Sequence, residues 1–306
     1  SKTPYRISFF GGGTDYPYWY KKNKGLVIGT SIDKYCYITL RSLPPFFKNK
    51  HRLVWSKIET VNRFHQIQHP AIRECLKLYN IEKGVEIHHV GDLPARSGIG
   101  SSSSFAVGLI SALNCYTNKK VSKKKLAKQA INFEQNILNE VVGVQDQIFA
   151  SYGGFLSIEI KKNSDFLISD LIKKNDKLKE LENNITLLYS GKSRFASNIA
   201  KNQKNNFKKK ISSYEVLHQL ALEAKNVIEK KYCVEDLGLI MNESWKIKKT
   251  LSNKVSNNFI NNIYDVAENC GVYGGKILGA GGGGFLLFLT NKNSKKKLKS
   301  KLKNFL

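Results

Sequence analysis

The spacing of apolar and polar positions distinguishes strand-like from helix-like segments in the first half of the chain. Alternating or continuous apolar runs rich in β-branched residues predict strands at residues 6–10, 25–40, 85–90 and 153–160. We expect the stretch 25–40 to hold two strands joined near residues 31–34. Residues 61–78 have helical spacing, but Pro70 lacks the backbone N–H that a helix interior needs and must interrupt it.

Helical spacing dominates the middle and the end of the chain. Helices are predicted at residues 105–113, 126–138, 145–150, 214–231 and 234–251, and short strands at 185–188, 276–278 and 285–289. Residues 161–184 have the weakest pattern and are rich in Lys, Asp and Asn, so we place a domain join there. The order of elements shows no regular βαβ alternation, which predicts an α+β protein with domains at residues 1–180 and 181–306.

Composition excludes several classes of protein. With 306 residues and 41% hydrophobic content, the chain can form real cores and is not largely disordered. No apolar run approaches the roughly 18 residues of a membrane span, and no signal peptide is visible. The five cysteines are scattered and never spaced C-x-x-C, which favours reduced thiols. We therefore expect a cytoplasmic protein without a membrane partner.

The formal charge of +26 requires a separate interpretation. Such an excess can indicate a polyanion partner such as nucleic acid. Arginine, however, occurs at only seven positions, and the lysines lie in short runs, with abundant Asn, along the whole length. This dispersed pattern is typical of a compositional bias, so we expect no nucleic-acid partner.

Two glycine-rich segments carry most of the chemical information. In Ser97-Gly-Ile-Gly-Ser-Ser-Ser-Ser104 the glycines let backbone N–H groups approach a ligand, and an apolar helix follows at once. This pattern favours a polyphosphate site, although the serines could instead cap the helix. Residues 279–284 formally contain G-x-G-x-x-G, but a strand follows where a dinucleotide site needs a helix. No G-x-x-x-x-G-K-[ST] motif occurs in the chain.

Two carboxylates in the middle of the chain are candidates for one site. In a continuous helix Glu134 and Asp146 would lie about 18 Å apart, too far to serve one metal ion. A break at Gly143 could fold Asp146 back toward Glu134. Glu140 is the competing acid. Spacing alone leaves open that Glu134 is a solvated helix residue and Asp146 a helix cap.

Three motifs in order narrow the function. PYRISFFGGGTD at residues 4–15, LPARSGIGSSSSFA at 93–106 and KILGAGGGGF at 276–285 resemble the signature motifs of the GHMP small-molecule kinase superfamily. The motifs span nearly the whole chain. The resemblance implies the GHMP kinase fold, with a ribosomal-S5-like N-terminal domain and a ferredoxin-like C-terminal domain. It also implies ATP and Mg²⁺ as cofactors.

The resemblance also implies roles for individual residues. Asp146, within GVQDQ, would accept or orient the proton of the acceptor hydroxyl, and Arg6 would neutralise charge beside it. Ser102, or alternatively Ser101, would hold Mg²⁺ together with Glu134. The residues implied in binding the ATP phosphates are Ser97, Gly98, Ile99, Gly100, Ser101, Ser102, Ser103, Gly281, Gly282 and Gly283.

The first motif departs from the galactokinase pattern, which has Glu-His before Thr-Asp. Here Gly12 and Gly13 precede Thr14 and Asp15. The change opens space, removes a negative charge that would repel a phosphate, and keeps Asp15 for sugar hydroxyls. In this version, FFGGGTD, the motif resembles the heptose 7-phosphate kinases and the kinase domain of fucokinases. These four residues are therefore predicted to bind the substrate.

A second substrate element is predicted in YSGKSRFAS. Arg194 is the only arginine after Arg96, and a guanidinium can bind a phosphate through two parallel hydrogen bonds. With Lys192 and Ser193 it is the candidate for binding the substrate's own phosphate. The alternative is an ordinary surface arginine.

The resulting hypothesis is an ATP-dependent kinase that phosphorylates the anomeric hydroxyl of D-glycero-D-manno-heptose 7-phosphate. The 1,7-bisphosphate would serve GDP-heptose and surface polysaccharide synthesis. A fucose- or galactose-type C1 kinase is the alternative within the class. A non-catalytic nucleotide-binding or RNA-binding protein is the alternative from another class. The oligomeric state, including a homodimer, stays open.

Overall fold

The chain forms two compact units, each built from segments that are distant in sequence. The computed structural model describes residues 1–172, 175–192 and 196–303. Unit 1 comprises Ser1–Tyr5, Ser31–Ala95 and Gly100–Gly153, and unit 2 comprises Arg6–Thr30, Arg96–Ile99 and Gly154–Leu306. Strands β1 (Lys2–Phe10) and β2 (Gly25–Ser42) pair with each other, and each runs through both units.

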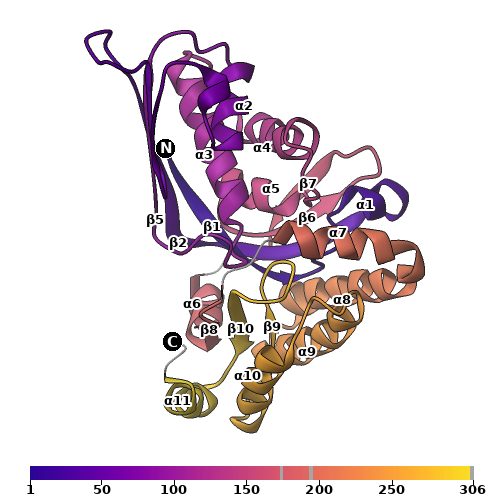
Figure 1. The fold of residues 1–306 in the computed structure, drawn as a ribbon. Helices are drawn as coiled ribbons and strands as arrows, with labels where there is room; N and C mark the ends of the chain where they lie inside the picture. The colour runs from indigo at the N-terminus through magenta and orange to yellow at the C-terminus, as the bar shows by residue number, and fades with distance from the viewer. Residues whose placement is uncertain (173–174, 193–195, 304–306) are drawn as a thin grey trace. The chain divides into compact units, whose positions relative to one another are not determined.

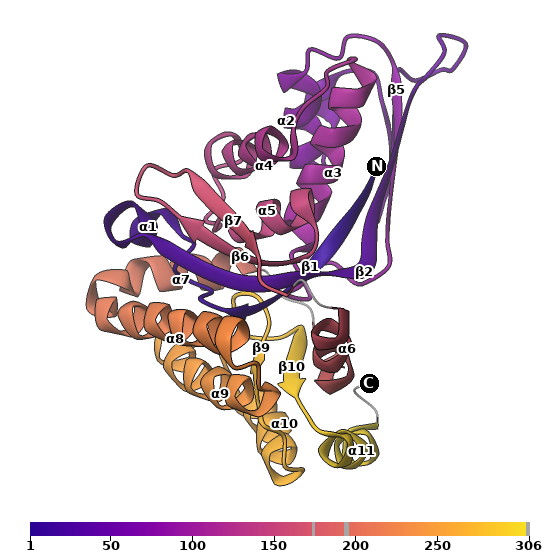
Figure 2. The ribbon, with the colours of Figure 1, turned by 180° about the vertical axis from the view of Figure 1, so that it is seen from behind.

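Unit 1 is a sheet with helices packed on one of its faces (Figures 1 and 2). The second half of β2 pairs antiparallel with β5, β5 pairs parallel with β3, and β3 pairs antiparallel with β4. Helices α2, α3, α4 and α5 cover the sheet. The elements are β3 (His51–Val54), β4 (Ile58–Val61), η1 (Phe64–Gln66), α2 (Pro70–Leu78), β5 (Val85–Gly91), α3 (Ser101–Tyr116), α4 (Lys123–Asn132), η2 (Phe133–Ile137) and α5 (Gln145–Tyr152).

Unit 2 contains two groups of antiparallel strands. The first half of β2 pairs with β6, which pairs with β7, and a separate three-stranded sheet has the order β8-β10-β9. Helix α9 packs on β9 and β10, and α8 packs on α9. The elements are α1 (Pro17–Asn23), β6 (Phe155–Ile160), β7 (Phe166–Asp170), α6 (Asn175–Asn184), β8 (Ile185–Tyr189), α7 (Ala196–Asn206), η3 (Phe207–Lys209), α8 (Ile211–Lys230), α9 (Val234–Thr250), α10 (Asn258–Asn269), β9 (Gly274–Ile277), β10 (Phe285–Leu289) and α11 (Lys292–Lys301).

The core of the three-stranded sheet is aromatic. Trp245 of α9 and Tyr264 of α10 have ring centroids 6.0 Å apart, and Tyr264 lies 5.7 Å from Phe288 of β10. All three side chains are buried in one apolar cluster. Their burial fixes β9 and β10, which flank the glycine-rich segment 279–284.

The predicted α+β class is confirmed, but the expected turn near residues 31–34 is wrong. β2 is one strand from Gly25 to Ser42. Its residues 25–30 pair with β6 and its residues 36–42 pair with β5. The polar segment lies where the strand changes neighbours, and its Asp33 and Lys34 are exposed. Polar residues there mark the change of partner within a continuous strand.

The predicted helix over residues 61–78 is half wrong. Strand β4 ends at Val61, and α2 begins at Pro70. Proline is favoured in the first turn of a helix because its missing N–H would have no intrahelical partner there. His69 is the N-cap, and its ring nitrogen accepts a hydrogen bond from the Ile72 N–H at 3.4 Å. Pro70 therefore starts the helix and does not interrupt one.

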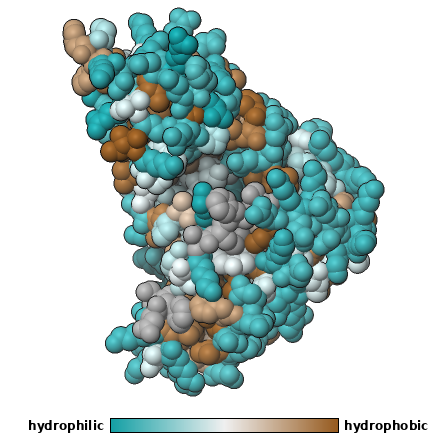
Figure 3. All heavy atoms as spheres, viewed as in Figure 1, coloured by the Kyte–Doolittle hydropathy of each residue, from teal (hydrophilic) through white to brown (hydrophobic). Residues whose placement is uncertain are grey.

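The surface seen in Figure 3 is mostly hydrophilic, with smaller apolar areas between the polar side chains. Among the described residues, no helix combines the length and apolar character needed to cross a membrane. All five cysteine thiols are free, and Cys36, Cys75 and Cys270 are buried.

Candidate active site

The segment predicted to bind phosphate leads directly into α3. Gly98 and Gly100 adopt left-handed φ values of +88° and +74°, which favour glycine, and the helix begins at Ser101. Gly100 is the N-cap and supplies no side-chain cap. The first N–H groups of a helix lack intrahelical acceptors and lie at its positive end. This loop therefore has the backbone geometry of an anion site.

The serine hydroxyls do not serve as the helix cap considered from the sequence. Ser103 Oγ donates to Glu134 Oε2 at 2.7 Å, and Ser102 Oγ donates to Glu134 Oε1 at 3.3 Å. Ser104 Oγ donates to the Pro4 carbonyl at 2.8 Å. Ser102 is exposed, whereas Ser103 is buried. Two consecutive hydroxyls of α3 thus contact one carboxylate.

Glu134 lies at the start of η2, a π-helical turn that continues α4. Such wider turns re-aim side chains and often occur at functional sites. The residue is only 1% exposed, so the alternative of a solvated helix residue is wrong. Its Oε2 also accepts a hydrogen bond from Gln147 Nε2 of α5.

Burial raises the pKa of Glu134 to about 7, and the nearby charges of Glu140 and Asp146 act in the same direction. Hydrogen bonds from Ser103 and Gln147 oppose the rise. A cation would offset the cost of burying this carboxylate. Mg²⁺ prefers oxygen ligands and binds proteins through one or two of them together with substrate phosphates. The Ser102 hydroxyl and the Glu134 carboxylate fit that requirement.

The break proposed between the two carboxylates is confirmed. α4 ends at Asn132, η2 continues it to Ile137, and α5 begins only at Gln145, so the helix is interrupted between the two carboxylates. Asp146 is half-buried in the first turn of α5, and its charge acts on Glu134. Glu140 is also half-buried, and burial raises its pKa. Within unit 1 the structure therefore brings together Ser102, Ser103, Glu134 and Asp146.

Arg6 belongs to unit 2 and contacts the second motif. The residue is 4% exposed on β1. Its Nη1 donates to the Gly98 carbonyl at 2.7 Å, and its backbone N–H donates to the Ile99 carbonyl at 3.0 Å. Arg6 thus fixes the part of the phosphate-binding segment that belongs to its own unit.

The Gly-Gly-Gly-Thr-Asp turn follows β1 and is held by its own polar groups. Thr14 Oγ1 donates to the carbonyls of Gly11 and Leu26, at 2.8 and 2.9 Å. Asp15 is 1% exposed, and its Oδ1 accepts the N–H of Gly13 at 3.0 Å. A Cβ at Gly11 would collide with the Leu26 carbonyl, so only glycine fits. Gly12 is half-buried.

The glycine segment of the third motif connects β9 to β10, as its sequence predicts. The Gly282 N–H donates to the Val255 carbonyl at 2.7 Å, and a Cβ at Gly281 would lie 2.5 Å from the same oxygen. Phe285 N–H donates to the Ser97 carbonyl at 2.9 Å. The second and third motifs are therefore adjacent in unit 2.

Lys192, predicted to bind substrate, is exposed and lies against this glycine segment. Its carbonyl accepts the Gly284 N–H at 2.9 Å, and a Cβ at Gly283 would lie 2.9 Å from the same carbonyl. Its ammonium lies 4.5 Å from the centre of the Phe259 ring. The other two predicted phosphate ligands, Ser193 and Arg194, lie outside the described residues.

Two buried lysines of unit 2 were missed by the sequence interpretation. Lys276 of β9 donates to the Phe9 carbonyl at 2.7 Å. Lys248 of α9 donates to the carbonyls of Ile277 and Gly279, at 3.3 and 2.6 Å. Neither could be distinguished in the sequence from the many other lysines along the chain, except that Lys276 lies inside the third motif.

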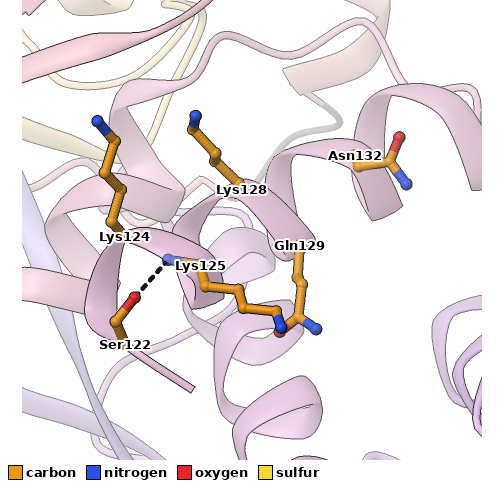
Figure 4. A pocket seen from close by; sticks show the side chains of 6 residues that line it. All are labelled: Ser122, Lys124, Lys125, Lys128, Gln129 and Asn132. Carbon is orange, nitrogen blue, oxygen red and sulfur yellow. Dashed lines mark hydrogen bonds between the residues drawn. The ribbon is translucent and has the colours of Figure 1, made fainter.

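A shallow hollow of about 480 Å³ on α4 contains none of the predicted site residues (Figure 4). Its lining residues are Ser122, Lys124, Lys125, Lys128, Gln129 and Asn132. Ser122 Oγ accepts the Lys125 N–H at 3.2 Å as the helix N-cap. The hollow is therefore a feature of the surface of α4.

Two family models match the chain. The N-terminal domain of GHMP kinases matches residues 62–154, and the GHMP kinase C-terminal domain matches residues 230–306, together more than half of the chain. The chain belongs to the GHMP kinases. It is therefore a phosphotransferase that moves a phosphoryl group from ATP to a hydroxyl acceptor.

Individual GHMP kinases are similar over nearly the whole chain. D-glycero-alpha-D-manno-heptose 7-phosphate kinase from Campylobacter jejuni subsp. jejuni serotype O:2 is 29% identical, covering 96% of this chain and 90% of that protein. The bifunctional fucokinase/GDP-fucose pyrophosphorylase of Arabidopsis thaliana is 26% identical, over 96% of this chain but 30% of the relative. A crystal structure of a D-glycero-D-manno-heptose 1-phosphate kinase from Bacteriodes thetaiotaomicron has a TM-score of 0.80 at 23% identity, covering 99% and 92% of the two chains. This last similarity confirms the fold.

Proposed function

We propose that this GHMP kinase is a sugar kinase that phosphorylates the anomeric hydroxyl of D-glycero-D-manno-heptose 7-phosphate. The observation that carries the kinase chemistry is the buried Glu134 carboxylate, bound by Ser102 and Ser103 of the glycine–serine segment and influenced by the charge of Asp146. The similarity to a heptose 7-phosphate kinase over 96% of the chain supports the substrate. The product would be the 1,7-bisphosphate, an intermediate suited to GDP-heptose and surface polysaccharide synthesis.

The reaction forms a bond between the acceptor oxygen and the γ-phosphorus of ATP and breaks the bond between that phosphorus and the bridging oxygen of ADP. Asp146 accepts or orients the proton that the acceptor hydroxyl loses. Arg6 and the N–H groups of residues 97–103 offset the negative charge of the phosphates. Glu134 and Ser102 would hold Mg²⁺, which would supply neutralisation of phosphate charge. The glycines at 281–283 support the phosphate-binding segment from the third motif.

The acceptor half of the proposal depends on the first motif and on residues 192–194. Gly12 and Gly13 leave the space and the neutral surroundings that an extended, phosphorylated sugar needs, and Asp15 and Thr14 complete the turn. Lys192, Ser193 and Arg194 would bind the 7-phosphate, with the guanidinium making the paired contacts.

A panel of acceptors tests the proposal directly. ADP release would be measured with Mg²⁺ and ATP in the presence of heptose 7-phosphate, the unphosphorylated heptose, fucose, galactose or mevalonate. We expect heptose 7-phosphate to give the highest kcat/KM. A higher kcat/KM with fucose or galactose would assign the alternative C1 kinase activity. ADP release that no acceptor raises above the ATP-only level would refute the kinase function.

Two variants separate chemistry from binding within the same assay. Asp146→Asn should lose turnover by a factor of about 100 or more while it retains ATP binding, because the amide cannot accept the proton. Arg194→Ala should raise the KM for heptose 7-phosphate about tenfold without a similar effect on ATP, whereas Arg63→Ala, an exposed arginine of unit 1, should not. An unchanged KM in Arg194→Ala would assign the phosphate to another residue.

A further inference from the structure

Lys276 is a buried lysine of the third motif whose side chain contacts the first motif. Its residue exposure is 5%, on the short strand β9 at the start of the third motif. Its Nζ donates to the Phe9 carbonyl at 2.7 Å, across 267 positions of sequence. Lysine usually keeps its ammonium in water, so a fully buried one needs a specific reason.

The charges around Lys276 belong to the first motif. Burial is the largest cause of a lowered pKa for Lys276, the nearby charge of Arg6 on β1 lowers it further, and Asp15 of the following turn opposes both, so that the pKa falls to about 7. Both neighbours are themselves almost fully buried. Lys276 is thus placed where its charge acts on the carboxylate that the proposed function assigns to the acceptor.

The carbonyl that Lys276 holds precedes a turn with little freedom. Phe9 is followed by Phe10 and Gly11. Gly11 packs so closely on the Leu26 carbonyl of β2 that no Cβ would fit there. The Gly13 N–H and the Thr14 hydroxyl bind within the turn and to Leu26. Because the turn is fixed internally, the Phe9 carbonyl and the contacts with Leu26 together set the position of the whole turn.

The other end of the Lys276 backbone continues into the glycine segment. Two residues further along, the Leu278 carbonyl lies so close to Gly98 that a Cβ there would be 2.6 Å away. The Gly98 carbonyl in turn accepts a hydrogen bond from the guanidinium of Arg6, which is a residue of β1. Within unit 2 the three motifs therefore form a closed ring of contacts, and Lys276 is the side chain that joins the third motif to the first.

We propose that Lys276 is a positioning residue for the acceptor, which holds the turn at residues 11–15 in register with the glycine segment at 279–284. The proposal rests on the proposed function only in assigning the turn to the acceptor. Lys248 offers a matched control, because it is also a buried lysine of unit 2 and its ammonium donates to Ile277 and Gly279, at the other end of β9 and in the glycine segment. Substitutions at the two lysines therefore distinguish an effect on the turn at residues 11–15 from an effect on the glycine segment.

The test is the split of kinetic constants in Lys276→Met and Lys248→Met. Lys276→Met should raise the acceptor KM at least about tenfold and change the Kd of a non-hydrolysable ATP analogue less than about threefold, a change of the size expected for one lost buried hydrogen bond. Lys248→Met should show the reverse split. Lys276→Gln keeps a hydrogen-bond donor, so its acceptor KM should rise less than that of Lys276→Met. This variant replaces Lys276→Met in the assay if the methionine variant does not fold.

Each contrary result identifies what has failed. An acceptor KM within about twofold of wild type in a folded Lys276 variant would refute the positioning role. Equal effects of both lysine variants on acceptor and nucleotide would also refute it, because they indicate a general loss of structure. Wild-type protein that turns over no acceptor would refute the proposed function instead, and the analogue binding data would then stand on their own.

Discussion

The replacement of Lys276 by methionine should change how stability depends on pH. The buried ammonium has its pKa lowered from 10.5 to about 7, so above pH 7 the folded protein has released a proton that the unfolded chain still binds. Stability therefore rises with pH in this interval, because the unfolded state binds more protons. Below pH 7 both states are protonated and the full cost of burying the charge remains. Methionine has a similar length and no charge, so its variant lacks this dependence.

The size of the effect follows from the separation of the two pKa values. Each pH unit between them is worth about 1.4 kcal/mol of unfolding free energy. Between about pH 7 and about pH 9, wild type should gain roughly 2 kcal/mol relative to Lys276→Met, allowing for partial deprotonation at the lower limit. Near pH 7 the variant should be the more stable protein, since an apolar side chain replaces a buried charge.

Urea unfolding followed by tryptophan fluorescence measures this difference. Trp19 and Trp245 belong to unit 2, as does Lys276, whereas Trp55 belongs to unit 1. A Trp55→Phe background therefore limits the signal to the relevant unit. Lys254→Met, at an exposed lysine, is the control and should follow wild type at every pH. Parallel curves for wild type and Lys276→Met would refute the reasoning, because they would mean that Lys276 stays charged in the folded protein.

Three further predictions concern the motif residues. Gly98→Ala should lower kcat/KM for ATP at least about tenfold, since the left-handed φ and a backbone carbonyl of the third motif leave no room for a Cβ. Ser103→Ala should cost roughly 1–3 kcal/mol in urea unfolding at neutral pH, because Glu134 loses a buried hydrogen bond. Gly13→Ala should raise the acceptor KM, because its φ is +110° and a Cβ would lie 3.2 Å from the Tyr214 ring.

Each of these predictions has a clear contrary outcome. Wild-type kinetics in Gly98→Ala would mean that the loop adapts to the added methyl group. An unchanged unfolding free energy in Ser103→Ala would mean that water replaces the hydroxyl. An acceptor KM in Gly13→Ala that matches wild type, measured by ADP release, would place the acceptor away from that glycine.

The fold class could be predicted from the sequence, whereas spacing alone left the grouping of the two carboxylates open and the family resemblance favoured it. The glycine-rich motifs could be recognised in the sequence because positions such as Gly11 and Gly98 have no room for a Cβ, and this local restriction requires glycine. The break between Glu134 and Asp146 was readable from Gly143, since glycine interrupts a helical pattern. The π-helical turn that buries Glu134 has no such signal in the sequence.

The features that the sequence concealed depend on tertiary context. A strand that changes partner midway needs polar residues where neither neighbour covers it, and in β2 these residues imitate a turn. Apart from its place in the third motif, nothing in the sequence distinguished Lys276 from the other lysines, because burial is a property of the folded unit. The division at residue 180 stays a prediction, and the compact units are built from interleaved segments.

The contact between Lys276 and Phe9 also has a consequence for protein synthesis. On the ribosome, the first motif emerges early, but the lysine that holds it is made about 270 residues later. Contacts with such large sequence separation form late, because a long loop must close first. A nascent chain whose first unit has already emerged from the ribosome would still lack the contact that holds the turn at residues 11–15. A chain truncated anywhere before residue 276 should therefore lose acceptor phosphorylation as completely as a chain with mutations in the first motif.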